Sequence, residues 1–540
     1  MIRDEIGRGR QVNRRVLRIA LLAIVLGIAA AGVAVVLTNL IAFVTNLAFF
    51  GRLSLTEASP ADANIGLWFV PVAVLGGLVV GLMARYGSAA IRGHGIPEAM
   101  ERVLEHESKI PMRMTILKPI SSAIAIGTGG PFGAEGPIIA TGGAIGSMIG
   151  QFLHTTAKER KTLLAAGAAA GMAATFGSPV AAVLLAVELL LFELSARTLV
   201  PVILASATGT IAGALMRGDA AAFPMEAIAS PGAAAFAFYL LLGLIMGLAS
   251  VVVTWAVYAI EELFEHLPIH WMWWPALGGL AVGLIGIVAP RVLGVGYDNI
   301  RAIVAGTIPI GALAVLVSMK FLVWVIALGS GTSGGTLAPL FTIGGGLGAL
   351  IGVGFAAAFP DAGIDPRLAG LVGMAAMFTG ASRAVLASVV FAFETTRQPL
   401  GLVPLLGGCG VAYLVSCALM DHSIMTQKLA ARGVRVPTEY GFDPLSRLDV
   451  AAVMSAIVDP SIIGAARVFA DQSLRAAVDL LVHDDLDNIG VVTRDAPEVV
   501  VGVLTRADAL RGFKARMDEN IVRRPLRVRR GQGVRIRLSE

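Results

Sequence analysis

Three short segments rich in glycine and proline interrupt apolar stretches of the sequence, and each could bind an anion through its backbone. They are Gly93-His94-Gly95-Ile96-Pro97, Gly133-Ala134-Glu135-Gly136-Pro137 and Gly334-Gly335-Thr336-Leu337-Ala338-Pro339. Glycine lets the backbone bend and proline suits the first turn of a helix, so each segment predicts a helix start with unpaired N–H groups and a partial positive charge. Several such helix ends aimed at one point would hold an anion without a full cation, weakly enough for it to leave again. The alternative is that these segments only let helices pack closely.

Glu135 is the single acidic residue between Met114 and His154, a stretch that is otherwise largely apolar. A carboxylate at membrane depth is costly and marks a functional site. Beside backbone N–H donors it could occupy the anion site itself when ionised and leave that site when protonated. Glu135 is therefore predicted to be a gate that responds to pH and voltage; the alternative is a carboxylate that caps a helix N-terminus.

Two glutamates and two lysines also lie inside apolar segments, and each could have a structural or a functional role. Glu188 and Glu394 could cap helices or pair with Arg383. Lys118 and Lys320 could lend positive potential to the two mouths of a pore, or extend their ammonium groups to the membrane interface.

The composition places the chain in a membrane. Of 540 residues, 56% are apolar and 15% charged, and the mean hydropathy is +0.79, whereas soluble proteins average about 45–50% apolar and about 25% charged. An ordinary soluble enzyme and a disordered chain are thus excluded. We expect no enzyme, because the sequence lacks H-E-x-x-H, Walker A and G-x-S-x-G motifs, and no metal site, because it lacks a Cys/His cluster. The net charge of +5 is carried largely by the two ends, so it indicates orientation and no nucleic-acid partner.

The N-terminal end predicts how the chain lies in the bilayer. Residues 1–18 carry six arginines, and the apolar run that follows from Ile19 to about Phe50 is long enough for a tilted spanning helix. Arginines beside the first span place this end in the cytoplasm, and the Arg-rich C-terminal part should stay there too. The expected protein is a multi-pass protein of the cytoplasmic (inner) membrane with an even number of crossings.

The sequence contains an internal repeat. Residues 127–150 and 329–352 share a pattern of glycine and proline at an offset of 202 positions. The paired positions include Lys118 and Lys320, Pro137 and Pro339, Gly142 and Gly344, and residues 171–174 and 373–376. After these the register slips by four, so that Glu188 matches Glu394. The chain is thus a duplicated half, and we favour inverted repeats because the broken helices then meet near the membrane midplane from opposite sides.

The segments GHGIPE, GAEGP and GGTLAP, in this order and with this duplication, resemble the CLC family of chloride channels and proton-coupled chloride transporters. The resemblance covers roughly residues 15–435. It implies an all-α, polytopic, inverted-repeat fold with broken and re-entrant helices, a homodimer with one pore per subunit, and a gate at Glu135. It also implies an anion site whose residues are His94, Gly95, Ile96, Ala134, Gly136, Thr336, Leu337 and Met425.

The chain departs from the family pattern at four positions. His94 stands where the family has an anion-coordinating serine, Leu337 where it has a phenylalanine, and Met425 where it has a central tyrosine. The coupled exchangers of the family also have an internal proton-transfer glutamate, and this chain has Leu189 at the matching position. Leucine cannot carry a proton, and its neighbour Glu188 faces about 100° away on a helix. His94 could be a neutral donor to the anion or a pH sensor.

These departures favour a CLC-type chloride channel with a glutamate gate, passive or weakly coupled to protons. The alternative is a chloride or fluoride/proton antiporter with a non-standard proton path. Nitrate and bicarbonate are further candidate anions. A third hypothesis is a receptor with a vestigial pore that senses nucleotide.

The charged C-terminal part resembles a single CBS module, a small α/β regulatory fold. The segment Gly502-Val503-Leu504-Thr505-Arg506-Ala507-Asp508 resembles its G-h-x-T-x-x-D signature. The resemblance makes Thr505 and Asp508 candidates for binding an adenine nucleotide, although support of the dimer is the favoured role; no other cofactor is expected. The predicted domains are a cytosolic N-terminus (1–18), the membrane domain (19–435, halves about 19–216 and 232–420), the CBS-like domain (436–512) and a basic tail (513–540).

Overall fold

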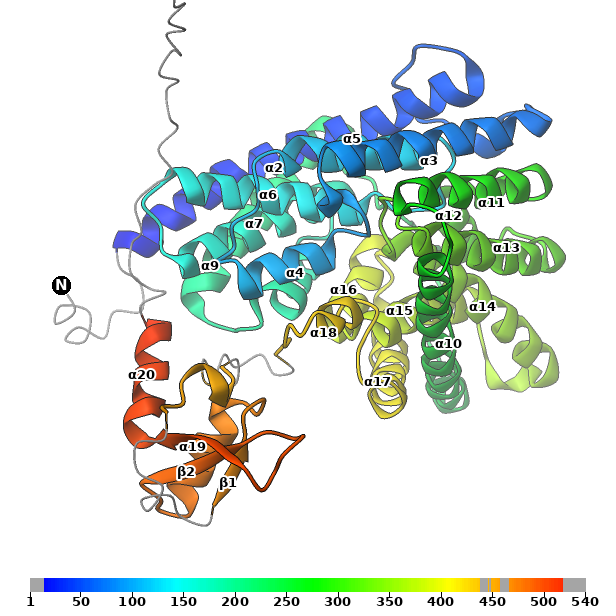
Figure 1. Ribbon diagram of the computed structural model, residues 1–540. Coiled ribbons are helices and arrows are strands. Elements are labelled where there is room, and N and C mark those ends of the chain that lie inside the picture. Colours follow the sequence, from blue (N-terminus) through cyan, green and yellow to red (C-terminus); the bar gives the residue numbers. More distant parts are fainter. Residues whose placement is uncertain (1–13, 438–444, 446–447, 457–465, 518–540) are drawn as a thin grey trace, which may run out of the picture.

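The computed structural model describes residues 14–437, 445, 448–456 and 466–517 (Figure 1). A large helical part is followed by a small unit of strands and helices. The first half of the helical part contains α2 (Arg14–Phe50), α3 (Phe69–Tyr86), α4 (Ile96–Glu105), α5 (Met114–Gly127), α6 (Glu135–Phe152), α7 (Ala157–Phe176), α8 (Pro179–Ala186) with a π-helical turn (Val187–Leu191), and α9 (Ala196–Arg217). The second half contains α10 (Ala233–Glu265), α11 (Trp274–Val288), α12 (Tyr297–Ala305), α13 (Ile310–Gly329), α14 (Leu337–Ala358), α15 (Pro366–Ser382), α16 (Val385–Thr396), α17 (Leu402–Leu419) and the short α18 (Gln427–Ala431).

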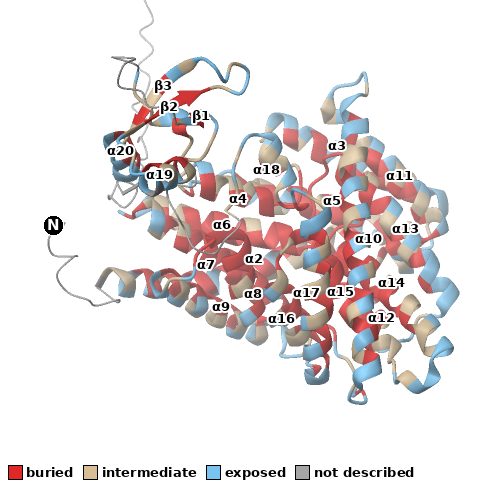
Figure 2. Ribbon diagram, turned by 90° about the horizontal axis from the view of Figure 1, so that it is seen from below, coloured by how far each residue is buried: buried red, intermediate tan, exposed pale blue. Residues whose placement is uncertain are grey.

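The helical part has the surface of a membrane protein. In the described part of the chain, eight helices are long and apolar enough to cross a bilayer. Large apolar side chains such as Leu21 and Val25 of α2 are exposed, while small residues of the same helix, Ala23, Ala30 and Ala34, are buried. Figure 2 shows buried residues along the middle of the bundle and exposed ones on its rim. This pattern suits lipid outside and close helix packing inside, so the prediction of a multi-pass membrane protein is confirmed.

The two halves are arranged about a local two-fold axis. Gly133 and Gly335, which are 202 positions apart, face each other in an antiparallel bridge. The N–H of Gly133 donates to the carbonyl of Gly335 (3.1 Å), and the N–H of Gly335 donates to that of Gly133 (2.9 Å). An exchange of identical bonds between repeat mates requires a two-fold relation at this point. The predicted duplication is thus realised as two halves that meet at their glycine-rich loops.

Two carboxylates join the halves a second time. The carboxylate of Glu188 accepts the backbone N–H groups of Leu386 (3.0 Å) and Ala387 (2.9 Å) in the first turn of α16. Its repeat mate Glu394 accepts those of Val180 (3.1 Å) and Ala181 (2.9 Å) in the first turn of α8. Each acid therefore caps a helix of the other half, where a negative charge also suits the helix dipole.

Of the two alternatives for Glu188 and Glu394, the structure supports helix capping. Arg383 donates to the backbone carbonyls of Ser416 and Asp421 near the end of α17. The guanidinium group of Arg383 thus contacts backbone carbonyl oxygens in its own half of the chain.

The repeat-equivalent lysines hold loops. Lys118 and Lys320 are both fully buried. The ammonium group of Lys118 donates to the carbonyls of Ile91 and Gly93, both at 2.8 Å. That of Lys320 donates to Val292 (2.9 Å) and Gly294 (3.3 Å). Their ammonium groups thus end inside the protein, so the prediction that they extend to the membrane interface is wrong: backbone carbonyls, rather than water, solvate these charges.

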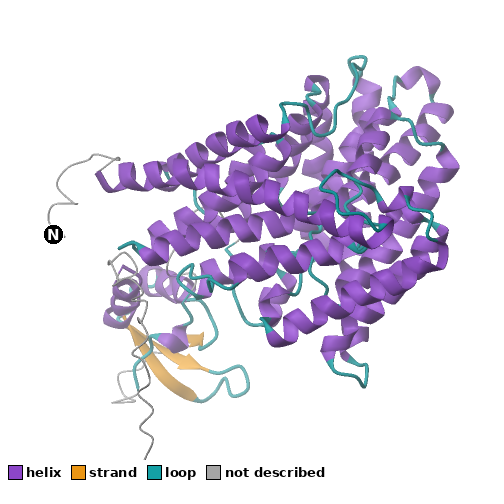
Figure 3. Ribbon diagram, turned by 90° about the horizontal axis from the view of Figure 1, so that it is seen from above, coloured by secondary structure: helices purple, strands orange, loops and turns teal. Residues whose placement is uncertain are grey.

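The small C-terminal unit holds the strands of the described chain (Figure 3). Its elements are β1 (Arg467–Phe469), α19 (Leu474–His483), β2 (Asn488–Val492), β3 (Val500–Thr505) and α20 (Arg506–Met517). Strand β2 pairs in parallel with β1 and antiparallel with β3. A separate apolar core includes Val468, Leu481 and Ile489. The expected small α/β fold is therefore present; the basic tail 513–540 lies largely outside the described residues.

Candidate functional site

The three glycine-rich loops predicted from the sequence meet at one place. The N–H of Gly93 donates to the carbonyl of Thr332 (3.1 Å), and the N–H of Gly334 donates to that of Gly93 (3.4 Å). The bonds between Gly133 and Gly335 tie the remaining loop to the same point. Because α4, α6 and α14 begin directly after these loops, three helix N-termini lie around one point.

Glycine is needed here because the backbones approach closely. A Cβ atom at Gly335 would lie 2.6 Å from the carbonyl oxygen of Gly133 and 3.0 Å from the nitrogen of Gly136. One at Gly95 would lie 2.9 Å from the carbonyl oxygen of Gly136. These distances are below van der Waals contact, so a side chain at either position would push the helix starts apart. Of the two predicted roles of the loops, close packing is thus present, and it is what brings the helix ends together.

A fourth helix start belongs to the site and was missed in the sequence. Segment Gly294-Val295-Gly296 precedes α12 as Gly93-His94-Gly95 precedes α4, at an offset of 201 positions. The four glycines have φ values of +67°, +78°, +85° and +93°, in the left-handed region that favours glycine. The segment lacks the proline and polar residues of the other three. A search at the repeat offset with one residue of slip would have found it.

Glu135 lies at the centre of this arrangement. Only 1% of it is exposed. Its Oε1 accepts a hydrogen bond from the hydroxyl of Tyr297, the first residue of α12, at 3.0 Å. The backbone N–H groups of Glu135 and of Ala338, in the first turn of α14, also face the carboxyl group. The carboxyl group therefore sits among the amides that a small anion would need.

Three polar atoms of the site are buried and have no hydrogen-bond partner in the part of the chain that the structure describes. They are Nδ1 of His94, Oε2 of Glu135 and Oγ1 of Thr336. A buried polar atom without a partner is costly, so such atoms point to a ligand. Of the three, the Thr336 hydroxyl can donate to an anion, whereas an ionised Glu135 carboxylate can only accept.

His94 and Met425 lie together. The His94 ring hydrogen-bonds the backbone of Ile424, whose carbonyl also accepts the Tyr258 hydroxyl at 2.9 Å. Met425 follows Ile424 and is fully buried. A carbonyl only accepts, so the bonded ring nitrogen carries the proton and Nδ1 of a neutral ring is an acceptor. His94 could therefore donate to an anion from Nδ1 only when protonated. Ile96 and Leu337 are also buried, at the first positions of α4 and α14.

Leu189 is buried in the π-helical turn that follows α8. Its neighbour Glu188 uses both carboxylate oxygens to cap α16. The structure thus places no titratable group at position 189, and moving Glu188 there would break two hydrogen bonds to backbone N–H groups.

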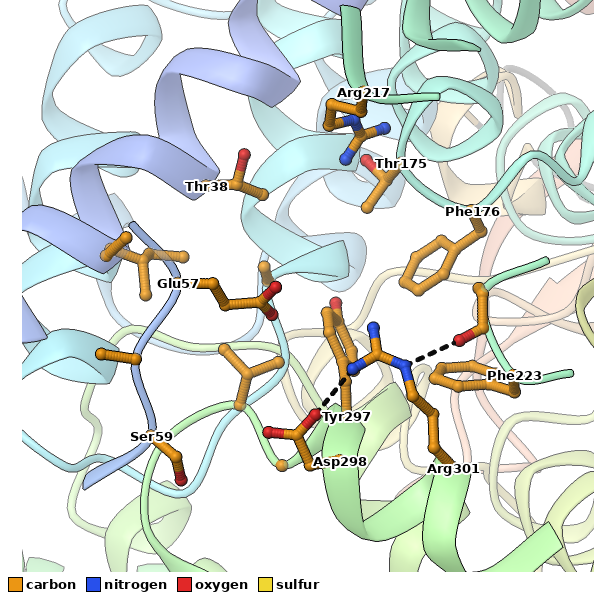
Figure 4. Close-up of a pocket in the computed structure, with 18 of the residues that line it drawn as sticks. Thr38, Glu57, Ser59, Thr175, Phe176, Arg217, Phe223, Tyr297, Asp298 and Arg301 are labelled. Atoms are coloured by element: carbon orange, nitrogen blue, oxygen red, sulfur yellow. Dashed lines mark hydrogen bonds and ion pairs between the residues drawn. The ribbon is translucent and has the colours of Figure 1, made fainter. Parts of the chain in front are cut away.

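A large cavity reaches the site. This vestibule cavity has a volume of about 800 Å³. Its lining includes Glu57, Ala134, Arg217, Tyr297 and Arg301, so it extends to residues next to the Glu135 carboxyl (Figure 4). Arg301 donates to Asp298 (2.6 Å) and to the carbonyl of Ala222 (3.1 Å). The cavity was not predicted, because its residues come from distant segments.

Thr505 and Asp508 bond each other in the C-terminal unit. The N–H and hydroxyl of Thr505 donate to Oδ2 of Asp508 at 2.9 and 2.7 Å, and the N–H of Asp508 donates to Oγ1 of Thr505 at 3.1 Å. The hydroxyl of Ser455 donates to Oδ1 of Asp508 at 2.7 Å. The pair caps the start of α20, as in a capping box.

Comparisons with known proteins agree with the fold. The chain matches the voltage gated chloride channel family over residues 75–417 and belongs to it. The H(+)/Cl(-) exchange transporter ClcA of Yersinia pseudotuberculosis is 30% identical over 67% of this chain and 78% of its own length. Chloride channel protein CLC-f of Arabidopsis thaliana is 31% identical over 64% of this chain. The match covers only 46% of the length of that relative.

A solved structure has the same fold. The X-ray structure of a slow cyanobacterial Cl−/H+ antiporter superposes with a TM-score of 0.68, covering 78% of this chain and 99% of that one at 24% identity. The protein is therefore an anion transporter of the CLC family, in the inverted-repeat fold that the resemblance implied.

Proposed function

We propose that this chain exchanges a small monovalent anion for protons across a membrane, with Glu135 as the gate. The observation that carries the proposal is the position of the Glu135 carboxyl group at the N-termini of α6 and α14, among the N–H groups that would hold an anion. The relatives support proton coupling, because the Yersinia protein is named an exchange transporter and the cyanobacterial structure an antiporter. Chloride is the ion in both names and is the proposed substrate.

In the proposed mechanism, the Glu135 carboxylate and the anion compete for the same binding site. Ionised Glu135 fills the place between the helix ends and excludes the anion by charge and volume. Protonation removes the charge, so the carboxyl group leaves the N–H groups and the anion takes them. Since the anion enters only when Glu135 carries a proton, the two movements are linked.

Passive conduction is the second candidate, and Leu189 favours it. A buried leucine at this position cannot pass a proton, and both oxygens of the neighbouring Glu188 are engaged. Exchange would then need a proton path that bypasses position 189. His94 is a candidate group on such a path, as a pH sensor that donates from Nδ1 when protonated.

The same proposal includes the orientation of the chain in the membrane, its assembly as a homodimer and the role of the C-terminal α/β unit. The arginines before α2 support both termini in the cytoplasm of a cell membrane, and the vestibule cavity then opens to the outside. The family resemblance supports a homodimer. The small α/β unit is proposed to be a CBS-like module that supports this dimer, because Thr505 and Asp508 satisfy each other without a nucleotide.

Flux in liposomes tests the proposal. Purified protein is reconstituted with chloride, fluoride or nitrate inside, and anion efflux and proton uptake are recorded together over a range of pH. Exchange predicts proton uptake at a fixed ratio to chloride efflux, whereas a channel predicts chloride efflux without it. A receptor with a vestigial pore predicts no flux.

The variant Glu135→Gln tests the gate. It should carry chloride with no pH dependence and no coupled proton uptake, because its amide cannot ionise. Unchanged pH dependence in this variant would remove Glu135 from the gate.

A further inference from the structure

Tyr297 is held rigidly against the gate. Its ring packs edge-on against Phe176 at the end of α7, with the centroids 5.6 Å apart, and against Phe223 at 5.9 Å. Such aromatic pairs stabilise one ring orientation. Figure 4 shows the three side chains together at the wall of the vestibule cavity.

The backbone that carries Tyr297 is fixed as well. Gly294 and Gly296 form the bend before α12 with positive φ angles. The buried ammonium group of Lys320 holds the carbonyls of Val292 and Gly294. On the far side of Tyr297, the side-chain amide of Asn299 donates to the carbonyl of Arg291 at 2.7 Å. The phenol is thus placed by its ring and by its backbone.

The hydroxyl group of Tyr297 has one direction in which to donate. The backbone N–H of Ala134 faces its oxygen, which leaves the hydroxyl proton for Oε1 of Glu135 at 3.0 Å. The hydroxyl therefore bridges the residue before α6 and the gate carboxyl group.

We propose that Tyr297 is a positioning residue that holds ionised Glu135 in the anion site. Tyr297 thereby sets how acidic the solution must be before the gate opens. The proposal rests on the gating role of Glu135. A hydrogen bond to a carboxylate is stronger than one to a neutral carboxyl group, so the phenol favours the ionised, closed state.

Other charged groups act on the gate carboxyl group or on its phenol partner, and removing the hydroxyl leaves all of them in place. Lys320 attracts Glu135 from α13. Arg217, at the end of α9, acts on Tyr297 from across the vestibule cavity, and Glu57 faces Arg217. A change at Tyr297 that keeps the ring therefore removes only the hydroxyl, with its bond to Glu135 and the bond that it accepts from the Ala134 N–H.

The test is Tyr297→Phe, measured as chloride efflux from liposomes against pH. The ring and its packing stay, and only the hydroxyl is lost. We expect the pH of half-maximal flux to rise by about one unit, because loss of a charge-assisted hydrogen bond makes the carboxylate easier to protonate by about a factor of ten. Flux at neutral pH should rise accordingly.

Tyr239→Phe is the matched control. Tyr239 is buried in α10, and its hydroxyl donates to the carbonyl of Asp365 at 3.5 Å. The same atom is removed away from the gate, so the pH of half-maximal flux should stay where it is in the unmodified chain. Size-exclusion profiles establish that both variants fold.

The double variant Tyr297→Phe with Glu135→Gln separates the two proposals. We expect it to behave as Glu135→Gln alone, because no carboxylate remains to hold. If Tyr297→Phe has the same midpoint as Tyr239→Phe while Glu135→Gln abolishes pH dependence, the role of Tyr297 is refuted and the gate stands. If Glu135→Gln keeps its pH dependence, the gate itself is refuted.

Discussion

A single methyl group at Gly335 should disable the transporter without unfolding it. Gly335 has a negative φ, so Gly335→Ala imposes no backbone strain of its own. The new Cβ would lie 2.6 Å from the Gly133 oxygen, where an unstrained contact needs about 3.4 Å or more. The two loops must therefore separate by roughly 0.8 Å.

That displacement is large enough to break hydrogen bonds at the site. It lengthens the paired hydrogen bonds of 2.9 and 3.1 Å between Gly133 and Gly335 and moves the start of α14 away from Glu135. Losing one amide hydrogen bond to a bound anion costs about 1.5–3 kcal/mol, which corresponds to a factor of about 10 to 150. We expect chloride flux at saturating proton concentration to fall by at least about tenfold.

Gly354→Ala provides the control for this measurement. Gly354 is exposed in α14, and nothing lies within 4 Å of a Cβ placed there. The same methyl group is added to the same helix, so flux should stay within about twofold of the unmodified protein, since nothing in the site moves. Chloride efflux is measured with a chloride electrode after both variants are matched for reconstituted protein. Unmodified flux in Gly335→Ala would refute the reasoning that close approach of these loops forms the anion site.

Two further predictions concern the carboxylates between the halves and the position of the missing proton carrier. Glu188→Gln and Glu394→Gln each weaken a cap of two backbone N–H groups and should lower the free energy of unfolding by about 1–3 kcal/mol. In detergent, each variant should therefore have a lower melting temperature than the control Glu262→Gln, which changes an exposed glutamate. Equal melting temperatures would contradict the capping role. Leu189→Glu should raise the number of protons moved per chloride, measured from the reversal potential, because it puts a titratable group at the position where the coupled exchangers that the chain resembles have a proton-transfer glutamate. An unchanged ratio would show that protons do not pass this position, and Leu190→Glu controls for burying a charge nearby.

The position of the proposed gate could be suggested from the sequence because its signals are local. Glycine and proline before an apolar run predict a helix N-terminus wherever the helix goes, and a lone acid in such a run is conspicuous. The repeat also appears in the sequence, since Lys118 and Lys320 keep their spacing. From these residues alone, Glu135 and an anion site between broken helices could be expected.

Other features depended on which segments meet. Tyr297 follows a loop with no proline or polar signature, and 162 residues separate it from the Glu135 carboxyl group that it contacts. The capping by Glu188 and Glu394 could not be chosen over pairing with Arg383, because their partners are backbone amides of the opposite half. The lysines were expected near water, and only the fold supplies the carbonyls that satisfy them inside the protein.

The amino-acid sequence by itself determined that this chain lies in a membrane, that it is built of two similar halves, and where its glycine- and proline-rich helix starts lie, because these depend on composition and local backbone preference. The tertiary structure alone decided that four helix starts share one point, that the Tyr297 hydroxyl donates to the Glu135 carboxyl group, and that a cavity reaches the residues beside it. Such contacts form between residues far apart in the chain, and their geometry is set by close packing of glycine-lined helices that no local pattern encodes.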